Sequence, residues 1–274
     1  MEIEPGELLA DRLELRIVLL ADTEGLCITY FRFGSGTQGP QPHVHRLHAD
    51  CFLVLEGAMH LQLRGDERIE AESWAQVPHD VVHSFAPTTD EVAFLNVHAP
   101  SCGFGPYLRG KREGFDQQPA LEGGGRDPAT AVVCRLGGSE GETITDRPGR
   151  RVTLLGDTEE IAVTESIYGP GERGPDLHVH RDHTDAWFVL EGVLTFELRG
   201  GRSFETRAGA VVVVPPNVAH GFSNEGEVMA RFVNLHAPSC GFGEYMRGRP
   251  GFDQHEPPSD GGLDPAAVVV RTLR

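Results

Sequence analysis

The stretch His43-Val44-His45-Arg46-Leu47-His48-Ala49-Asp50, followed by Val54-Leu55-Glu56-Gly57, decides the architecture because it occurs twice. The second copy, 135 residues later, reads His178-Val179-His180-Arg181-Asp182-His183-Thr184-Asp185 and precedes Val189-Leu190-Glu191-Gly192. Downstream, Pro78 is followed five residues later by His83, and Pro215 at the same interval by His220. Histidine is the commonest metal ligand, and chance rarely duplicates a set of three histidines and one carboxylate. The sequence predicts two fused metal-binding domains.

The duplication extends over nearly the whole chain. Residues 16–24 align with 151–159, and Asn96–Gly105 aligns with Asn234–Gly243. Between the halves lies a segment rich in Gly and acidic residues, which is typical of an exposed linker. A length of 274 residues fits two domains of about 120–135 residues each. We therefore expect an N-terminal barrel at residues 1–137, a linker at 138–150 and a C-terminal barrel at 151–274.

Short apolar runs, separated by Gly, Pro, Asn and Asp, indicate an all-β fold of sandwich or barrel type. Short helices are expected only near Leu8–Leu13, Tyr107–Arg109 and Tyr245–Arg247. The runs predicted to be strands are Ile17–Leu20, Cys27–Phe33, Phe52–Leu55, Met59–Leu63, Trp74–Val77 and Val92–Val97, then Ile161–Ile167, Trp187–Leu190, Leu194–Leu198, Val211–Val214 and Ala230–Leu235.

Strand geometry explains how each histidine block makes a site. Residues two apart on a strand face the same way, about 6.5–7 Å apart, so His43 and His45 converge on one ion. His83 is the third candidate from a neighbouring strand, and Asp50 offers a negative oxygen. The second copy offers His178, His180, His220 and Asp185. Such a set suits one divalent transition metal per barrel, with Fe, Mn, Ni, Co, Cu and Zn all possible.

The amino-acid composition limits the classes of partner that the protein is expected to bind. A net charge of −17 disfavours nucleic acid, whose phosphates require an excess of Lys and Arg. No apolar run approaches the roughly 18 residues that span a membrane, and no signal peptide is visible at Met1–Gly6. Five cysteines do not suggest a disulfide framework, and only Cys102 and Cys240 occupy matching positions. We expect a cytoplasmic protein with a small-molecule substrate, and a homodimer is compatible with the sequence.

The chain resembles the cupin superfamily, whose first motif is Gly-x5-His-x-His-x3–4-Glu-x6-Gly and whose second ends in Pro-x-Gly-x2-His-x3-Asn. The duplication makes it similar to bicupins, and the resemblance implies two tandem jelly-roll barrels. Counting back from Gly57 and Gly192 places Asp50 and Asp185 where the family usually has Glu. Because Asp is shorter by roughly 1.3–1.5 Å, we expect it to act through water or to leave a three-histidine site rather than to bind directly.

Other repeated residues have two interpretations. His48 and His183 compete with the aspartates as ligands or support the ligands from behind. The pairs Asn96/His98 and Asn234/His236 alternate along a strand, so each pair either lines the pocket or holds the turn that follows. For the cysteines, packing is favoured over a nucleophilic role. The motif histidines themselves would be core polar residues in a metal-free cupin, but their retention in both copies favours metal binding.

Three functions remain open. The first is an oxygen-dependent dioxygenase resembling quercetinase-like bicupins, with a neutral or weakly acidic substrate and with Asp50 or Asp185 as a possible general base. Beside the histidine blocks, no arginine is expected to face the barrel interior in both copies. This argues against oxalate as the substrate. The second is a non-redox isomerase, lyase or decarboxylase at the same sites. The third is a cupin that binds a small molecule without turnover.

Overall fold

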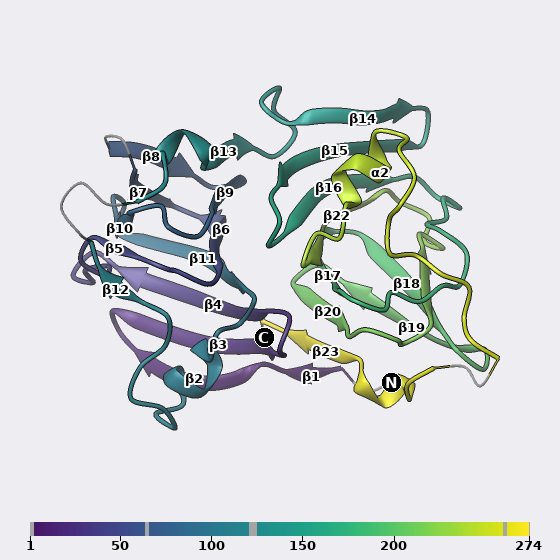
Figure 1. Cartoon of the computed structure of the whole chain (residues 1–274), viewed down its shortest axis with the longest axis horizontal. Coiled ribbons are helices and arrows are strands. Elements are labelled where there is room, and N and C mark those ends of the chain that lie inside the picture. Colours follow the sequence, from purple (N-terminus) through teal and green to yellow (C-terminus); the bar gives the residue numbers. More distant parts are fainter. Residues whose placement is uncertain (1–2, 64–65, 121–124, 260–261, 274) are drawn as a thin grey trace. The chain divides into compact units, whose positions relative to one another are not determined.

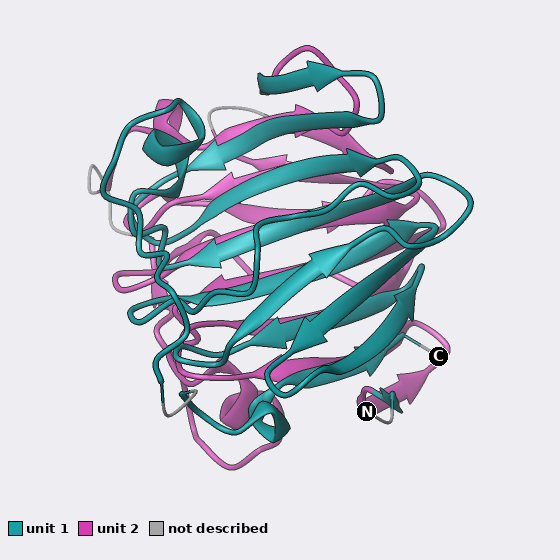
Figure 2. Ribbon diagram, turned by 90° about the vertical axis from the view of Figure 1, so that its right-hand side faces the viewer, with its two compact units in different colours: residues 1–5, 141–274 teal, residues 6–140 magenta. Residues whose placement is uncertain are grey.

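Strands dominate the computed structural model, which describes residues 3–63, 66–120, 125–259 and 262–273 (Figure 1). The chain divides into two compact units, coloured separately in Figure 2: unit 1 contains residues 1–5 and 141–274, and unit 2 contains residues 6–140. The predicted all-β fold with one barrel in each half is confirmed.

Unit 2 has a seven-stranded sheet in the order β13-β9-β6-β11-β4-β3-β2, a three-stranded sheet β10-β7-β8 and the pair β12-β5. Its elements are β2 (Glu7–Arg12), β3 (Leu15–Asp22), β4 (Cys27–Gly34), β5 (His43–Val44), β6 (Ala49–Glu56), β7 (Ala58–Gln62), β8 (Asp66–Glu70), β9 (Ser73–Val77), β10 (Ser84–Pro87), β11 (Glu91–Ala99), α1 (Phe104–Leu108), β12 (Gln118–Pro119), the 3₁₀ turn η1 (Pro128–Thr130) and β13 (Val132–Arg135).

Unit 1 repeats this plan with an eight-stranded sheet, β1-β23-β20-β17-β22-β16-β15-β14, and a three-stranded sheet, β19-β18-β21. Its elements are β1 (Glu4–Pro5), β14 (Glu142–Arg147), β15 (Arg150–Asp157), β16 (Ala162–Tyr168), β17 (Thr184–Glu191), β18 (Val193–Leu198), β19 (Arg202–Arg207), β20 (Ala210–Val214), β21 (His220–Ser223), β22 (Ala230–Ala237), α2 (Phe242–Met246), the 3₁₀ turn η2 (Pro265–Ala267) and β23 (Val269–Thr272).

The observed units differ from the expected domain boundaries in two places. The segment 138–150, expected as linker, contains β14, which pairs with β15 inside unit 1. The first residues of the chain also belong to unit 1, because β1 pairs in parallel with β23, as the purple and yellow strands of Figure 1 show. Neither β1 nor β14 contains an apolar run long enough to predict its pairing from the sequence.

The helix expected near Leu8–Leu13 is wrong, since these residues lie mostly in β2, which pairs antiparallel with β3. A sheet edge that offers backbone partners outweighs local preference in so short a segment. The other two expected helices are present as α1 and α2, shifted toward the N-terminus. No helix in the described part of the chain is long and apolar enough to cross a membrane.

Alternation along the central strands aims polar residues into the barrels. In unit 2, Phe94 belongs to the buried core, and Asn96 and His98 follow on the same face of β11. His98 is the cross-strand partner of Asp50 on β6. In unit 1, His236 on β22 is likewise the partner of Asp185 on β17. Each interior thus has an apolar part and a polar end.

Candidate metal centres

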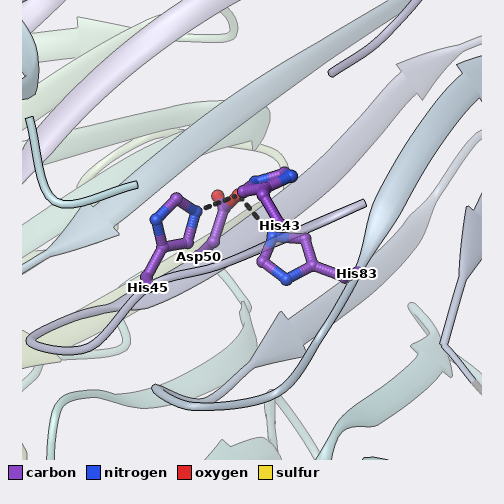
Figure 3. A group of neighbouring side chains, drawn as sticks. All are labelled: His43, His45, Asp50 and His83. Carbon is purple, nitrogen blue, oxygen red and sulfur yellow. Dashed lines mark hydrogen bonds and ion pairs between the residues drawn. The ribbon is translucent and has the colours of Figure 1, made fainter. Parts of the chain in front are cut away.

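His43, His45, Asp50 and His83 come together in unit 2, all buried, and Figure 3 shows their side chains pointing toward one another. The backbones of His43 and His83 pair directly, with N–H to O distances of 3.0 Å in both directions. This bridge places a histidine from the first motif beside the histidine of the second. Their ring centroids are 4.3 Å apart.

Hydrogen bonds to the backbone fix how these rings face. When Nδ1 carries the proton and donates it to a carbonyl, Nε2 keeps its lone pair and is free to bind a metal. All three ligand histidines of unit 2 have Nδ1 against a backbone oxygen: His43 against Gln41, His45 against Asp116, and His83 against Val81.

The Asp50 carboxylate lies at the point where these nitrogens meet. Its Oδ2 is 3.2 Å from Nε2 of His83 and 3.5 Å from Nε2 of His45. Nε2 of His45 is buried and makes no hydrogen bond. Lone pairs and a carboxylate facing one another repel unless a cation or extra protons lie between them. The donor set therefore fits a divalent ion.

The reach of Asp50 differs from what its length suggested. Ligands on adjacent corners around an ion at about 2.1 Å lie roughly 3 Å apart, which is close to the observed separations. The aspartate therefore reaches the cluster without a shift of β6. Asp50 lies at the start of β6, which runs between β9 and β11, so the sheet itself places the carboxylate in the interior.

Unit 1 holds the same arrangement in His178, His180, Asp185 and His220. Asp185 Oδ2 is 3.1 Å from Nε2 of His180 and 3.3 Å from Nε2 of His220. The Nδ1 atoms again face backbone oxygens: His178 that of Asp176, His180 that of Asp253, and His220 that of Val218.

Burial keeps His43 and His178 in their neutral, metal-binding forms. It lowers the pKa of His43 to about 4 and that of His178 to about 3, with neighbouring histidines adding to the effect. At His180 the Asp185 carboxylate outweighs burial and raises the pKa. Burial opposes ionisation of Asp50 and Asp185, but the surrounding histidines outweigh it and hold both pKa values well below their usual range. This direction is opposite to the one that suits a general base at neutral pH, so the aspartates fit a ligand role better.

A second layer of polar residues stands behind each cluster. In unit 2, both nitrogens of His48 are engaged, by His98 at 2.7 Å and by Asp116 at 3.0 Å. Asn96 in turn contacts both Asp50 and His98. His48 thus has hydrogen-bond partners at both nitrogens, and it also forms, with His45 and His98, a group close enough together to hold an ion. In unit 1 a wider grouping of His180, His183, Asp185 and His236 also lies within metal-binding distance.

Sequence reasoning missed the acid at the base of this layer. Asp116 accepts hydrogen bonds from the backbone N–H groups of Arg46 and Leu47 as well as contacting His48. Asp253 does the same for Arg181 and Asp182 and contacts His183. The signal was the repeated Gly-Phe-Asp-Gln at residues 114–117 and 251–254.

The helices also support the sites. Phe104 of α1 stacks on His98 with ring centroids 3.9 Å apart, and Phe242 of α2 stacks on His236 at 3.6 Å. The cysteines in the preceding turns match a packing role, since burial raises the pKa of Cys240 to about 11 and that of Cys102 in the same direction.

A cavity of about 270 Å³ in unit 1 is lined by His178, His180 and Asp185 together with Asn234 and His236. The Asn/His pair thus lines the pocket, as one of the two interpretations expected. Among the aromatic residues of this half, Phe222 lines the cavity, whereas Trp187 belongs to the core. The lining residues that the sequence argument missed include Arg150, Tyr168, Phe242, Tyr245 and Phe252.

Comparisons with known proteins agree with this architecture. The cupin domain family matches residues 164–236. The solved structure of oxalate decarboxylase from Bacillus subtilis at pH 4.6 is 17% identical, with 86% of this chain and 77% of that chain covered at a TM-score of 0.57. A structure from work on the Mn(II) centres of the same enzyme is 18% identical, covering 86% and 78% at a TM-score of 0.56. At this identity the likeness concerns the fold. No curated protein matches the sequence.

Proposed function

We propose that this two-domain cupin is a metal-dependent enzyme that binds a small organic substrate at the cluster of His178, His180, Asp185 and His220. The observation that carries this proposal is the cavity in unit 1, because three of the four cluster residues line it. A divalent ion bound there supplies Lewis acidity to a coordinated oxygen and, if it is redox-active, electrons to dioxygen.

The protein residues have separate tasks in this proposal. The three histidines and Asp185 would hold the ion, and a six-coordinate ion bound by these four donors would have two positions for other ligands. His236 contacts Asp185, Asn234 holds His236, and both residues line the cavity. The rings of Phe222, Phe242 and Phe252 keep water away from the reacting atoms.

The first reaction class is an oxygen-dependent dioxygenase. Two open coordination positions and an apolar cavity wall suit a substrate that reacts with oxygen in a site from which water is excluded. The test is oxygen uptake by protein loaded separately with Fe, Mn, Ni, Co or Cu, with flavonols, β-diketones and hydroxybenzoates as substrates. Uptake that requires both metal and substrate supports this reaction, and its absence across the panel rejects it.

The second class is non-redox chemistry at the same site: decarboxylation, isomerisation or lyase action. What favours it is that solved structures with this fold include oxalate decarboxylases. Turnover under strict exclusion of oxygen separates this class from the first. Tight binding of a metabolite that is recovered unchanged under both conditions would instead indicate a binding protein.

A further inference from the structure

The two halves differ at three matched positions on β15 and β16 of unit 1 and on β3 and β4 of unit 2. In unit 1, Arg150 on β15 pairs across the sheet with Tyr168 on β16, and Val152 pairs with Ser166. In unit 2, the identical register pairs Leu15 with Phe33 and Ile17 with Phe31. Arg150, Ser166 and Tyr168 thus correspond to Leu15, Phe31 and Phe33.

The replacements change the barrel interior. Phe31 and Phe33 belong to the buried core of unit 2 and pack against Phe94, each with ring centroids 5.5 Å from it. In unit 1, Tyr168 keeps a ring in the core at the position of Phe33, whereas Ser166 replaces the ring of Phe31, and both residues line the cavity. The phenyl ring of Phe31 therefore has no counterpart in the second half, which has a cavity beside its metal cluster.

Arg150 brings a positive charge to that cavity. Its guanidinium lies 4.6 Å from the centroid of the Tyr168 ring, and Nη1 donates to the backbone oxygen of Arg173 at 3.1 Å. The neighbouring acid, Glu172, is held by two hydrogen bonds from Arg147. Within residues 3–63, 66–120, 125–259 and 262–273, no carboxylate forms an ion pair with Arg150.

Resting on the function proposed above, we propose that the second half alone binds the substrate, a single-ring aromatic carboxylic acid whose carboxylate pairs with Arg150. Arginine recognises a planar carboxylate through paired, charge-assisted hydrogen bonds. The rings of Phe222, Phe252 and Tyr245 supply the surface for a flat apolar body. The cavity volume of about 270 Å³ lies just under the range typical of drug-sized ligands, about 300–1,000 Å³, which limits the ligand to a small molecule.

Calorimetric titration of the manganese-loaded full chain with 2-hydroxybenzoate, benzoate and the neutral analogue 2-hydroxybenzamide tests the proposal. We expect one acid molecule bound per chain, although each chain has two clusters. Arg150→Leu, which installs the residue of the first half, should weaken binding of the acids at least tenfold and leave the amide unchanged. Arg150→Lys should recover part of the loss. The control Arg16→Leu removes a positive charge from β3, the strand of unit 2 that matches β15, and should not change binding.

A transplant provides the reverse test. The triple variant Leu15→Arg, Phe31→Ser and Phe33→Tyr should raise the stoichiometry toward two acid molecules per chain. If it fails to fold in a thermal melt, the Arg150 series still decides. Absence of binding by both acids, two acid molecules per parent chain, or binding unaffected by Arg150→Leu would overturn the proposal. If an acid binds through Arg150 but is recovered intact with and without oxygen, the enzymatic function fails while this inference stands.

Discussion

His98 Nδ1 lies 2.7 Å from His48 Nε2 in the interior of unit 2, and the equivalent atoms of His236 and His183 lie 3.2 Å apart in unit 1. Such a contact requires one ring to donate and the other to accept, so it ties the two tautomers together. The far nitrogen of His48 faces the Asp116 carboxylate and that of His98 faces the Asn96 amide oxygen, and both oxygens only accept, so the protons on the two rings are coupled. The orientation of the ligand layer therefore depends on residues that do not touch the ion.

The first prediction concerns this support. Asp116→Asn removes the charge that orients His48 and should lower metal affinity of unit 2 about 10–100-fold, as loss of supporting hydrogen bonds commonly does. Competition with a chelator measures the change. His60→Gln, a histidine on β7 outside the cluster, is the matched control. Equal affinities for the two variants would show that the support has no role in binding.

Metal content should respond to each half separately. His43→Ala should remove the ion of unit 2 and His178→Ala that of unit 1, because each cluster is built from the strands of one unit. Elemental analysis of fully loaded protein should fall from two ions per chain to one in each variant. Loss of both ions from a single substitution would contradict the picture of one site per barrel.

Removing the carboxylate charge should be costly. Asp50→Asn keeps the shape of the side chain but loses the negative oxygen that lies among the histidine nitrogens. We expect at least a tenfold lower metal affinity in unit 2, and the same for Asp185→Asn in unit 1. The exposed Asp90→Asn serves as control. A change under twofold would favour the three-histidine site that the length of Asp first suggested.

Acid should destabilise the metal-free protein. Burial lowers the folded pKa of His43 and His236 to about 4, against about 6.5 in the unfolded chain. Between these pH values the unfolded chain takes up protons that the folded chain excludes, so stability is complete above about pH 6.5 and falls below it. Each such histidine contributes a slope of about 1.4 kcal/mol per pH unit. The pKa of His180, which Asp185 raises against the effect of burial, opposes this trend.

Urea unfolding at pH 7.5, 6 and 5 in the presence of a chelator measures this slope. The pH-dependent loss should shrink in His43→Gln, which has no proton to take up at that position. A free energy of unfolding that stays constant from pH 7.5 to pH 5 would mean that the buried histidines do not remain neutral in the folded protein.

The motif glycines that follow β6 and β17 should not tolerate a side chain. Gly57 has φ of +73°, and a Cβ there would lie 2.1 Å from the backbone oxygen of Glu91. Gly57→Ala should therefore lower the free energy of unfolding by more than about 1 kcal/mol. Gly114→Ala, whose Cβ would meet open space without a positive φ, should cost less. Similar melting temperatures for the two variants would refute the steric argument.

The sequence by itself determined the duplication, the strand content and the candidate residues of both metal clusters. These are local properties, since apolar runs, turn residues and the spacing of His43, His45 and His83 are visible along one chain. The period of two along a strand also placed Asn96 beside His98 on one face, before any neighbouring strand was known.

Only the tertiary structure decided what surrounds each cluster. The pairing of β1 with β23, the reach of Asp50, the support from Asp116 and the contrast between Arg150 and Leu15 all depend on residues far apart in sequence. A single chain gives no register between distant strands, and a one-residue slip in register reverses which side chains face the interior. Matched motifs therefore predicted two equal sites, whereas packing left a cavity beside Ser166 in one half and put the ring of Phe31 at the matching position in the other.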